Sequence, residues 1–400
     1  MRWFWFATFT LICSLLSVFL RQPLILLGEL LIIDLFITRK IKLFSRISQS
    51  IRPIPAWINL VIWLIVTIWV IRVLAIDSIT IQSPAVKPAL QAGDQVLVSK
   101  IHYGPRLPVV HRRLSGLYKI KRGDLLAYNF PEGDTTIKGM EAFSYYSLKR
   151  KREIENDTIT RVSLRYQPVD RRTPEVNRCI GLPGDTINIV AGQEGSHDNG
   201  QRAFDYIVEV KNRQLPMEFL HRLGLGPSEV QVVPEMGYVI PLRLDQIAMV
   251  KQRPEVTAIT AYTLEPGRGD YNIFPHDARY LWNRDNFGPV IVPRKGDSIR
   301  LTLLNIGIYQ RIIEVYEKNR LEVQKNEIFI NGSPATTYTI KQDYYFVLGD
   351  NRHHSRDSRH WGFLPADHII GKPILIWLST FKETGQLFSI YWNRIFNLPK

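Results

Sequence analysis

Near its C-terminus the chain reads Gly349-Asp350-Asn351-Arg352-His353-His354-Ser355-Arg356-Asp357-Ser358-Arg359-His360-Trp361-Gly362, and earlier it reads Asn177-Arg178-Cys179-Ile180-Gly181-Leu182-Pro183-Gly184-Asp185. Around both stretches, short apolar runs alternate with Gly, Pro, Asn and Asp, which is typical of strands joined by turns. Such runs occur at 79–82, 95–98, 125–130, 186–190, 206–210, 290–292, 299–303, 327–330, 344–348 and 374–378. We therefore predict an antiparallel all-β domain, with one helix over 305–317 and a hairpin turn at Asn331-Gly332.

Two further stretches complete an ordered set of four motifs. Ser83-Pro84-Ala85-Val86-Lys87-Pro88-Ala89-Leu90 is followed by Gly93-Asp94, and Lys121-Arg122-Gly123-Asp124-Leu125-Leu126-Ala127-Tyr128 precedes the 177–185 stretch. With an apolar N-terminal region, these motifs make the chain resemble the bacterial type I signal peptidases, or leader peptidases. The resemblance implies a membrane-anchored serine protease that removes signal peptides from exported proteins at the outer face of the membrane. It also implies a serine nucleophile and a lysine general base, which burial keeps neutral by lowering its pKa.

The resemblance places the catalytic pair on residues that cannot perform this chemistry. Pro88 and Gly93 fix the register of the first motif and assign the nucleophile position to Ala85, which has no hydroxyl. The base directly precedes the arginine of the third motif, so its position is Asn177. An amide does not take a proton from a serine near neutral pH. The scaffold motifs are present, but both halves of the dyad are missing.

The supporting positions are mostly retained. Ser83 matches the hydroxyl that assists the oxyanion hole, although it could also satisfy a backbone group in a turn before Pro84. Ser355 matches the serine that orients the lysine, and Asp357 matches a buried acid whose partner is Arg359 or Arg178. That ion pair has a structural role whether or not catalysis occurs. The resemblance implies peptide contacts at Ile81, Gln82, Pro84 and Val86.

Two other chemistries were weighed against this assignment. Ser83 could act with Lys87, but we expect Lys87 to face solvent, where an ammonium is a poor base. His353 and His354 invite a metal, yet no other ligands adjoin them, and we expect both to be exposed loop residues. Because Cys13 and Cys179 match no zinc pattern and the chain has no phosphate-binding glycine loop, we expect neither metal nor cofactor.

The N-terminal region has the composition of a membrane anchor. Residues 3–20 carry no charge and 57–76 are nearly as apolar, while the basic residues between them come without acids over 39–56. The positive-inside rule puts that loop in the cytoplasm and everything from residue 77 outside it. We read 3–20 as a retained anchor in preference to a cleaved signal peptide. Residues 24–38 are a short span, a re-entrant segment or an interfacial helix, and we count three membrane segments.

Composition and segment order give a domain plan for the chain of 400 residues. Since 45% of residues are hydrophobic and 22% are charged, global disorder is excluded. The net charge of +14 suits a lipid surface, and we expect no nucleic-acid partner. The fold is predicted to be mainly β, with N-terminal transmembrane helices and an extracytoplasmic antiparallel β domain of signal-peptidase type that holds a second, inserted β-rich subdomain. The predicted parts are a hydrophobic region at 1–38, a cytoplasmic loop at 39–56, a transmembrane helix at 57–76, the catalytic-type domain at 77–190 and 340–380 with a charged surface excursion at 136–165, the insert at 191–339 and a tail at 381–400.

The leading functional hypothesis is a catalytically inactive pseudopeptidase in the bacterial inner membrane, with its main domain on the periplasmic side. It would bind signal peptides or preproteins, and an active signal peptidase paralogue is a candidate partner. The alternatives are a working signal peptidase with a non-standard nucleophile and base, an engineered inactive form of one, and a structural envelope module. The tail could lie on the membrane surface or pack on the β domain.

Overall fold

The computed structural model describes residues 56–106, 113–138, 144–154, 163–194, 202–211, 215–226, 229–233, 237–381 and 389–399. The predicted membrane segments within 1–38 and the basic loop up to residue 55 lie outside these residues. The chain divides into two compact units. The first contains residues up to 81, 92–119 and 370–400, and the second contains 82–91 and 120–369.

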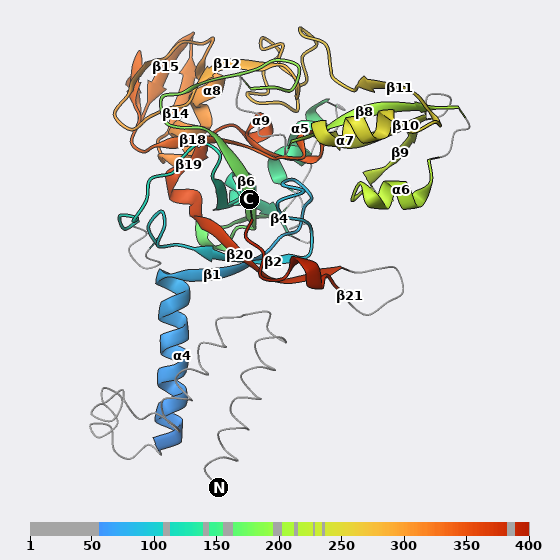
Figure 1. Cartoon of the computed structure of the whole chain (residues 1–400). Coiled ribbons are helices and arrows are strands. Elements are labelled where there is room, and N and C mark those ends of the chain that lie inside the picture. The colour runs from blue at the N-terminus through green and yellow to red at the C-terminus, as the bar shows by residue number, and fades with distance from the viewer. Residues whose placement is uncertain are drawn as a thin grey trace. The chain divides into compact units, whose positions relative to one another are not determined.

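The first unit joins a helix directly to a small antiparallel sheet (Figure 1). Its elements are α4 (Ala56–Leu74), β1 (Ile76–Thr80), β2 (Asp94–Ser99), β20 (Ile369–Phe381) and β21 (Ser389–Ile390). β2 pairs with β1 on one side and β20 on the other. None of the helices in the described ranges is long and apolar enough to cross a membrane. The span predicted at 57–76, most of which is α4, therefore stays a prediction.

The second unit has a central set of antiparallel strands, which includes residues of the motifs at 121–128 and 177–185. Its strands follow the order β3 (Leu125–Asn129), β6 (Pro174–Gly181), β18 (Tyr344–Leu348) and β19 (Leu364–Pro365). β6 places Asn177 opposite Leu126 on one side and Arg178 opposite Leu348 on the other. The sequence did not predict β6, because its polar residues break the alternation expected of a strand.

The following elements of this unit are short, and most of their strands pair in two-stranded sheets. They are β4 (Thr135–Ile137), α5 (Tyr145–Ile154), β5 (Leu164–Tyr166), β7 (Thr186–Ile189), β12 (Phe287–Ile291), β13 (Ser298–Arg300), α8 (Ile306–Arg311), β14 (Leu321–Gln324), β15 (Glu327–Ile330), β16 (Ser333–Pro334), β17 (Thr337–Thr339) and α9 (Ser358–Trp361). The helix predicted at 305–317 is confirmed as α8 and the π-helical turn that follows it. The predicted hairpin is confirmed as well, since Asn331 and Gly332 both have positive φ between the paired strands β15 and β16.

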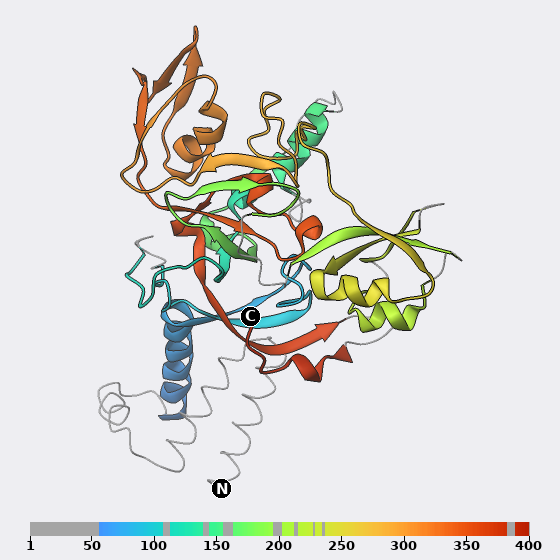
Figure 2. The same ribbon diagram turned by 45° about the horizontal axis from the view of Figure 1, so that its top comes forward.

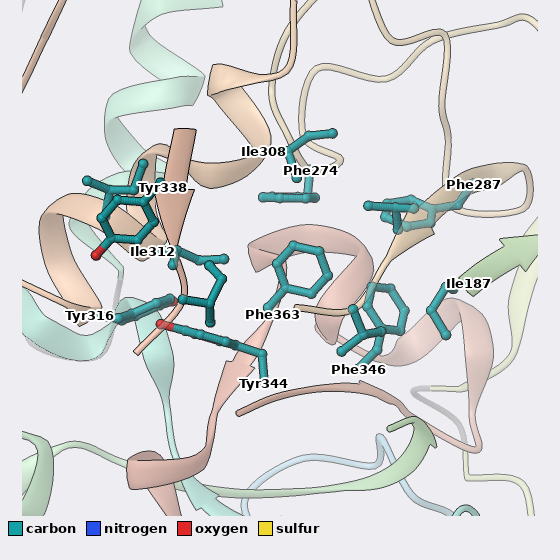
Figure 3. Packing of buried hydrophobic residues seen from close by; sticks show 14 of the residues in the cluster. Ile187, Phe274, Phe287, Ile308, Ile312, Tyr316, Tyr338, Tyr344, Phe346 and Phe363 are labelled. Atoms are coloured by element: carbon teal, nitrogen blue, oxygen red, sulfur yellow. The ribbon is translucent and has the colours of Figure 1, made fainter. Parts of the chain in front are cut away.

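An aromatic core packs around β18, the strand that leads into the C-terminal motif. Phe346 of β18 packs against Phe287 of β12 and Phe363, and Tyr344 lies beside Tyr316 (Figure 3). These side chains are almost completely buried. Because interiors pack at crystal-like density, this core fixes the strand that leads into Gly349.

A second sheet within the predicted insert has its own core. Its order is β11 (Val256–Ala261), β8 (Ala203–Val210), β10 (Gly237–Arg243) and β9 (Gln231–Val233). Helices α6 (Met217–Arg222) and α7 (Leu244–Lys251) lie beside it (Figures 1 and 2). Their apolar side chains join those of the sheet in one buried cluster. The fold is therefore mainly β and antiparallel, as predicted.

Candidate functional site

The nucleophile position lies against the start of the C-terminal motif. Ala85 is buried, and its carbonyl oxygen accepts a hydrogen bond of 2.9 Å from the Asn351 N–H. A Cβ added to Gly349 would lie 2.6 Å from the same oxygen and would collide with Ser355 Oγ. Glycine is therefore required at 349, because the chain segments of Ala85 and Ser355 both press on it.

Asn177 projects toward the same place. Antiparallel pairing of Leu348 with Arg178, continued by one residue, puts Asn177 opposite Gly349. Directly opposed residues in an antiparallel pair point to the same face of the sheet. The Asn177 side chain thus shares the face on which the Ala85 carbonyl and Ser355 Oγ lie. We call Ala85, Asn177 and Ser355 the dyad cluster.

Polar atoms of the dyad cluster are buried without being satisfied. Asn177 is 1% exposed and Ser355 is 6% exposed. Asn177 Nδ2 donates to the Tyr128 hydroxyl at 2.7 Å. Within the described part of the chain, Asn177 Oδ1, Ser355 Oγ and Asn351 Oδ1 have no hydrogen-bond partner. Each such atom carries a desolvation penalty, because no described residue donates a hydrogen bond to it.

Ser83 is exposed, and its hydroxyl contacts the backbone of the nearby Ala85. Its Oγ accepts a hydrogen bond of 3.2 Å from the Ala85 N–H. That N–H is the backbone donor that would face a developing oxyanion at the nucleophile position. Ser83 therefore does satisfy a local backbone group, which is the structural alternative raised from the sequence.

The four expected peptide-contact residues differ in accessibility. Ile81 and Val86 are buried, with Val86 only 1% exposed. Gln82 is exposed and Pro84 is half-buried. Gln82 and Pro84 are therefore accessible at the surface, whereas Ile81 and Val86 belong to the buried core.

Lys87 is not directed freely into solvent, so that expectation is wrong. Its ammonium lies 2.6 Å from Glu229 Oε2 and donates to the Gly224 carbonyl at 2.6 Å. Glu229 Oε2 also accepts from the Gly226 N–H, which closes a turn around the carboxylate. The sequence gave no signal for this contact, because its partners are more than a hundred residues away. An ammonium held by a carboxylate does not serve as a base for Ser83.

Asp357 and Arg359 form a completely buried, bidentate ion pair. Arg359 Nε and Nη2 donate to Asp357 at 2.9 and 2.8 Å. Burial alone would raise the pKa of Asp357, but the Arg359 guanidinium outweighs it and lowers that pKa. Asp357 also accepts from the Gly349 N–H at 3.1 Å, so the pair fixes the residue that separates Ala85 from Ser355.

The sequence left open whether Arg359 or Arg178 is the partner of Asp357. Arg178 instead contacts Asp350. It donates two hydrogen bonds, of 2.8 and 2.6 Å, to Asp350. Arg352 makes a similar two-bond contact with Glu194. Together with Asp357–Arg359 these pairs form what we call the ion-pair cluster. It connects the C-terminal motif to β6 and to the loop before β8.

His353 is not an exposed loop residue, whereas His354 is. The His353 side chain is buried between Asp205 and Asp285, at 3.2 and 2.7 Å. Burial lowers the pKa of His353, but the two carboxylates outweigh burial and raise it. Across the described ranges, no group of three or more His, Cys, Asp or Glu side chains is placed to hold a metal ion.

Sequence reasoning missed a carboxyl group beside the base position. Glu175 lies two residues before Asn177 on β6, so the two side chains share one face. The Tyr128 hydroxyl contacts Glu175 at 3.4 Å. Burial raises the pKa of Glu175 to about 7, against the opposing charge of Arg356. The spacing of two residues was the available signal, but it has meaning only once β6 is recognised as a strand.

The sequence model of the family described as "Signal peptidase, peptidase S26" matches residues 54–214 and 257–378. The chain belongs to this family. It is 24% identical over 377 residues to signal peptidase I of Buchnera aphidicola subsp. Baizongia pistaciae, covering 91% of this chain and 88% of that protein. It is 20% identical to signal peptidase I of Haemophilus influenzae, covering 80% and 68%. A segment of 42 residues is 50% identical to signal peptidase I of Aquifex aeolicus, covering 10% and 16%. The unmatched residues 215–256 hold α6, β9, β10 and α7, and also the partners of Lys87.

Proposed function

We propose that this family member is a pseudopeptidase, which binds signal peptides or preproteins outside the cytoplasm without cleaving them. The observation that carries the proposal is that alanine stands at the nucleophile position, 85, and asparagine at the base position, 177. The Ala85 side chain cannot attack a peptide, and the Asn177 side chain cannot take a proton. The expected anchor is the N-terminal apolar region, in the inner membrane. An active signal peptidase paralogue is the candidate protein partner.

Two contacts and the placement of Glu175 support the loss of catalysis. The Ala85 N–H is donated to Ser83, and Lys87 is paired with Glu229. Glu175 shares the face of Asn177. A carboxylate there would hold any nearby lysine in its charged form, which is the wrong form for a base.

Peptide binding is supported by the backbone next to Ala85. Gln82 and Ser83 are exposed, and the turn that begins at Pro84 leaves this segment at the surface. An extended peptide could add to such a segment as a strand. The family relationship makes peptides that carry a signal sequence the natural ligands.

A cleavage assay tests the inactive state. The substrate is a preprotein with an Ala-x-Ala site, and the enzyme is the full chain in detergent micelles. We compare the natural chain with Ala85→Ser/Asn177→Lys, and with the same pair plus Glu175→Gln. We expect cleavage only from the changed chains, with more from the triple variant near neutral pH. Cleavage by the natural chain would overturn the proposal, and Ser83→Ala would then be tested as a loss of the nucleophile.

Peptide contact at the exposed segment before Ala85 separates a pseudopeptidase from a structural envelope module. A photo-crosslinking residue at Gln82 should label a signal peptide, whereas the same residue at the exposed Leu304 should not. Equal labelling at both positions, or none at either, favours the structural module.

A further inference from the structure

The dyad cluster contains hydrogen-bond acceptors that have lost their donor. Among the residues that the structure describes, Asn177 Oδ1 and Ser355 Oγ are buried without partners. In the family's pattern a lysine stands at position 177 and a serine at position 85. Asparagine and alanine carry neither the ammonium nor the hydroxyl of that pattern, so the donors that those groups would offer are missing.

The orientation of the Asn177 amide is set by its neighbour. The Tyr128 hydroxyl has one hydrogen, which it donates to Glu175 Oε2. It must therefore accept from Asn177, and Nδ2 is the only group of the amide that can donate. Oδ1 is left pointing away from Tyr128 as a free acceptor.

Glu175 adds a charged acceptor to the same face. Its one hydrogen-bond donor in the described structure is Tyr128, at a long 3.4 Å. The raised pKa of Glu175 has burial as its main cause, and the charge of Arg356 opposes it; among the described residues, no cation is in hydrogen-bond contact with the Glu175 carboxyl. For comparison, Arg150 contacts Glu132 directly and holds the pKa of that buried carboxyl at about 2.

We propose that Asn177 Oδ1, Ser355 Oγ and the Glu175 carboxylate bind a primary ammonium group. An ammonium has three N–H donors and one positive charge, which match two neutral acceptors and one carboxylate. The source is the lysine side chain or the free amino terminus of a bound peptide. That source rests on the proposed function, whereas the ammonium site itself does not.

The first experiment tests the site without any peptide. Thermal unfolding of the full chain in micelles is followed with n-butylammonium, tetramethylammonium or potassium chloride at equal ionic strength. Tetramethylammonium carries the charge but no N–H donor. At about ten times its dissociation constant, n-butylammonium should raise the melting temperature by about 2 °C more than the other two salts. Equal effects of all three salts would overturn the proposal, and a larger effect of potassium would assign the site to a metal cation instead.

Two variants locate the effect. Asn177→Lys supplies an ammonium from the chain itself and should abolish the specific shift. Glu175→Gln should reduce it, while Glu218→Gln, which changes an exposed glutamate on α6, should leave it intact. A shift that survives both Asn177→Lys and Glu175→Gln would place the ammonium elsewhere and sink the assignment.

A second experiment distinguishes the two sources of the ammonium. Fluorescence anisotropy compares signal peptides that carry lysine or norleucine next to the Ala-x-Ala segment, and peptides with free or acetylated amino termini. A charge-assisted hydrogen bond predicts at least about tenfold tighter binding for the correct ammonium. Failure of every peptide to bind, alongside a positive salt experiment, would reject the peptide-binding function and keep the ammonium site.

Discussion

The two polar clusters of the second unit draw on the same C-terminal motif but differ in how their hydrogen bonds are satisfied. In the ion-pair cluster, Asp357 receives two bonds from the Arg359 side chain, one from the Arg359 N–H and one from Gly349. In the dyad cluster, Asn177 Oδ1 and Ser355 Oγ receive none from the described residues. Both clusters are buried to a similar degree.

This difference separates the residues that hold the fold from those that would perform the chemistry. Buried charges are strongly destabilising when one partner is lost, so a fold that keeps Asp357 must also keep Arg359. An unpaired hydroxyl or amide oxygen costs much less. The scaffold can therefore tolerate unpaired atoms at the proposed dyad positions, whereas it cannot tolerate a broken buried ion pair.

Removing the Asp357 carboxylate should produce the largest loss of unfolding free energy. Asp357→Ala leaves the Arg359 guanidinium buried without its carboxylate and removes acceptors from two backbone N–H groups. Breaking one side of a buried pair costs about 3–5 kcal/mol of unfolding free energy. Urea unfolding of the full chain in micelles measures the loss.

The matched control is Asp245→Ala, which breaks the surface pair of Asp245 with Arg243. Asp245 is 60% exposed, and such pairs contribute under about 1 kcal/mol. Comparable losses from the two variants would mean that burial does not set the cost of breaking an ion pair, and the explanation given for the ion-pair cluster would fail.

The sequence predicted more of the scaffold than of the site's surroundings. The hairpin at Asn331-Gly332 and the strand at 344–348 follow from local turn chemistry and alternation, and both are present. β6 was missed, since its buried polar residues Asn177 and Arg178 satisfy partners that only the folded chain supplies. The same reason hid the contact of Lys87 with Glu229 and the burial of His353.

The dyad positions themselves were predicted from motif register, and the structure brings Ala85 and Ser355 together at Gly349. The pairing of Asp357 with Arg359 was one of two options that the sequence offered. What the sequence could not show is that no residue the structure describes donates to Asn177 Oδ1. That property depends on the orientation of Tyr128, which lies on another strand.

Glu175 gives a prediction of intermediate size that depends on pH. The folded state raises the pKa of Glu175 from 4.5 to about 7, so the folded protein binds this proton more tightly than the unfolded chain does. Stability should therefore fall as pH rises from about 4.5 to about 7, by about 3 kcal/mol in total. Glu175→Gln should remove this fall, and it should raise the unfolding free energy at pH 8 but not at pH 4.

Glu132→Gln should behave in the opposite way. The Glu132 carboxylate is held by Arg150, which outweighs burial and lowers the pKa of Glu132 to about 2. Its contribution is present above the ordinary pKa of a glutamate and is lost as the pH falls toward 2. Glu132→Gln should thus destabilise the protein at pH 8. The measurement is the urea midpoint of unfolding at pH 4 and pH 8 for Glu175→Gln and Glu132→Gln. If both variants shift the midpoint at pH 8 in the same direction, the environments assigned to the two carboxyl groups are wrong.

The smallest change in unfolding free energy should come from replacing two serines of the 349–362 motif, which differ in their hydrogen bonds. Ser358 Oγ accepts from the Val347 N–H at 3.0 Å, whereas Ser355 Oγ has no partner within the described ranges. Ser358→Ala leaves a buried N–H unsatisfied and should cost about 1–3 kcal/mol. Ser355→Ala removes an unsatisfied hydroxyl, so it should be neutral within about 0.5 kcal/mol or slightly stabilising. If Ser355→Ala lowers the unfolding free energy as much as Ser358→Ala does, then Ser355 has a bound donor in solution. Adding n-butylammonium should then increase the difference in unfolding free energy between Ser355→Ala and the natural chain.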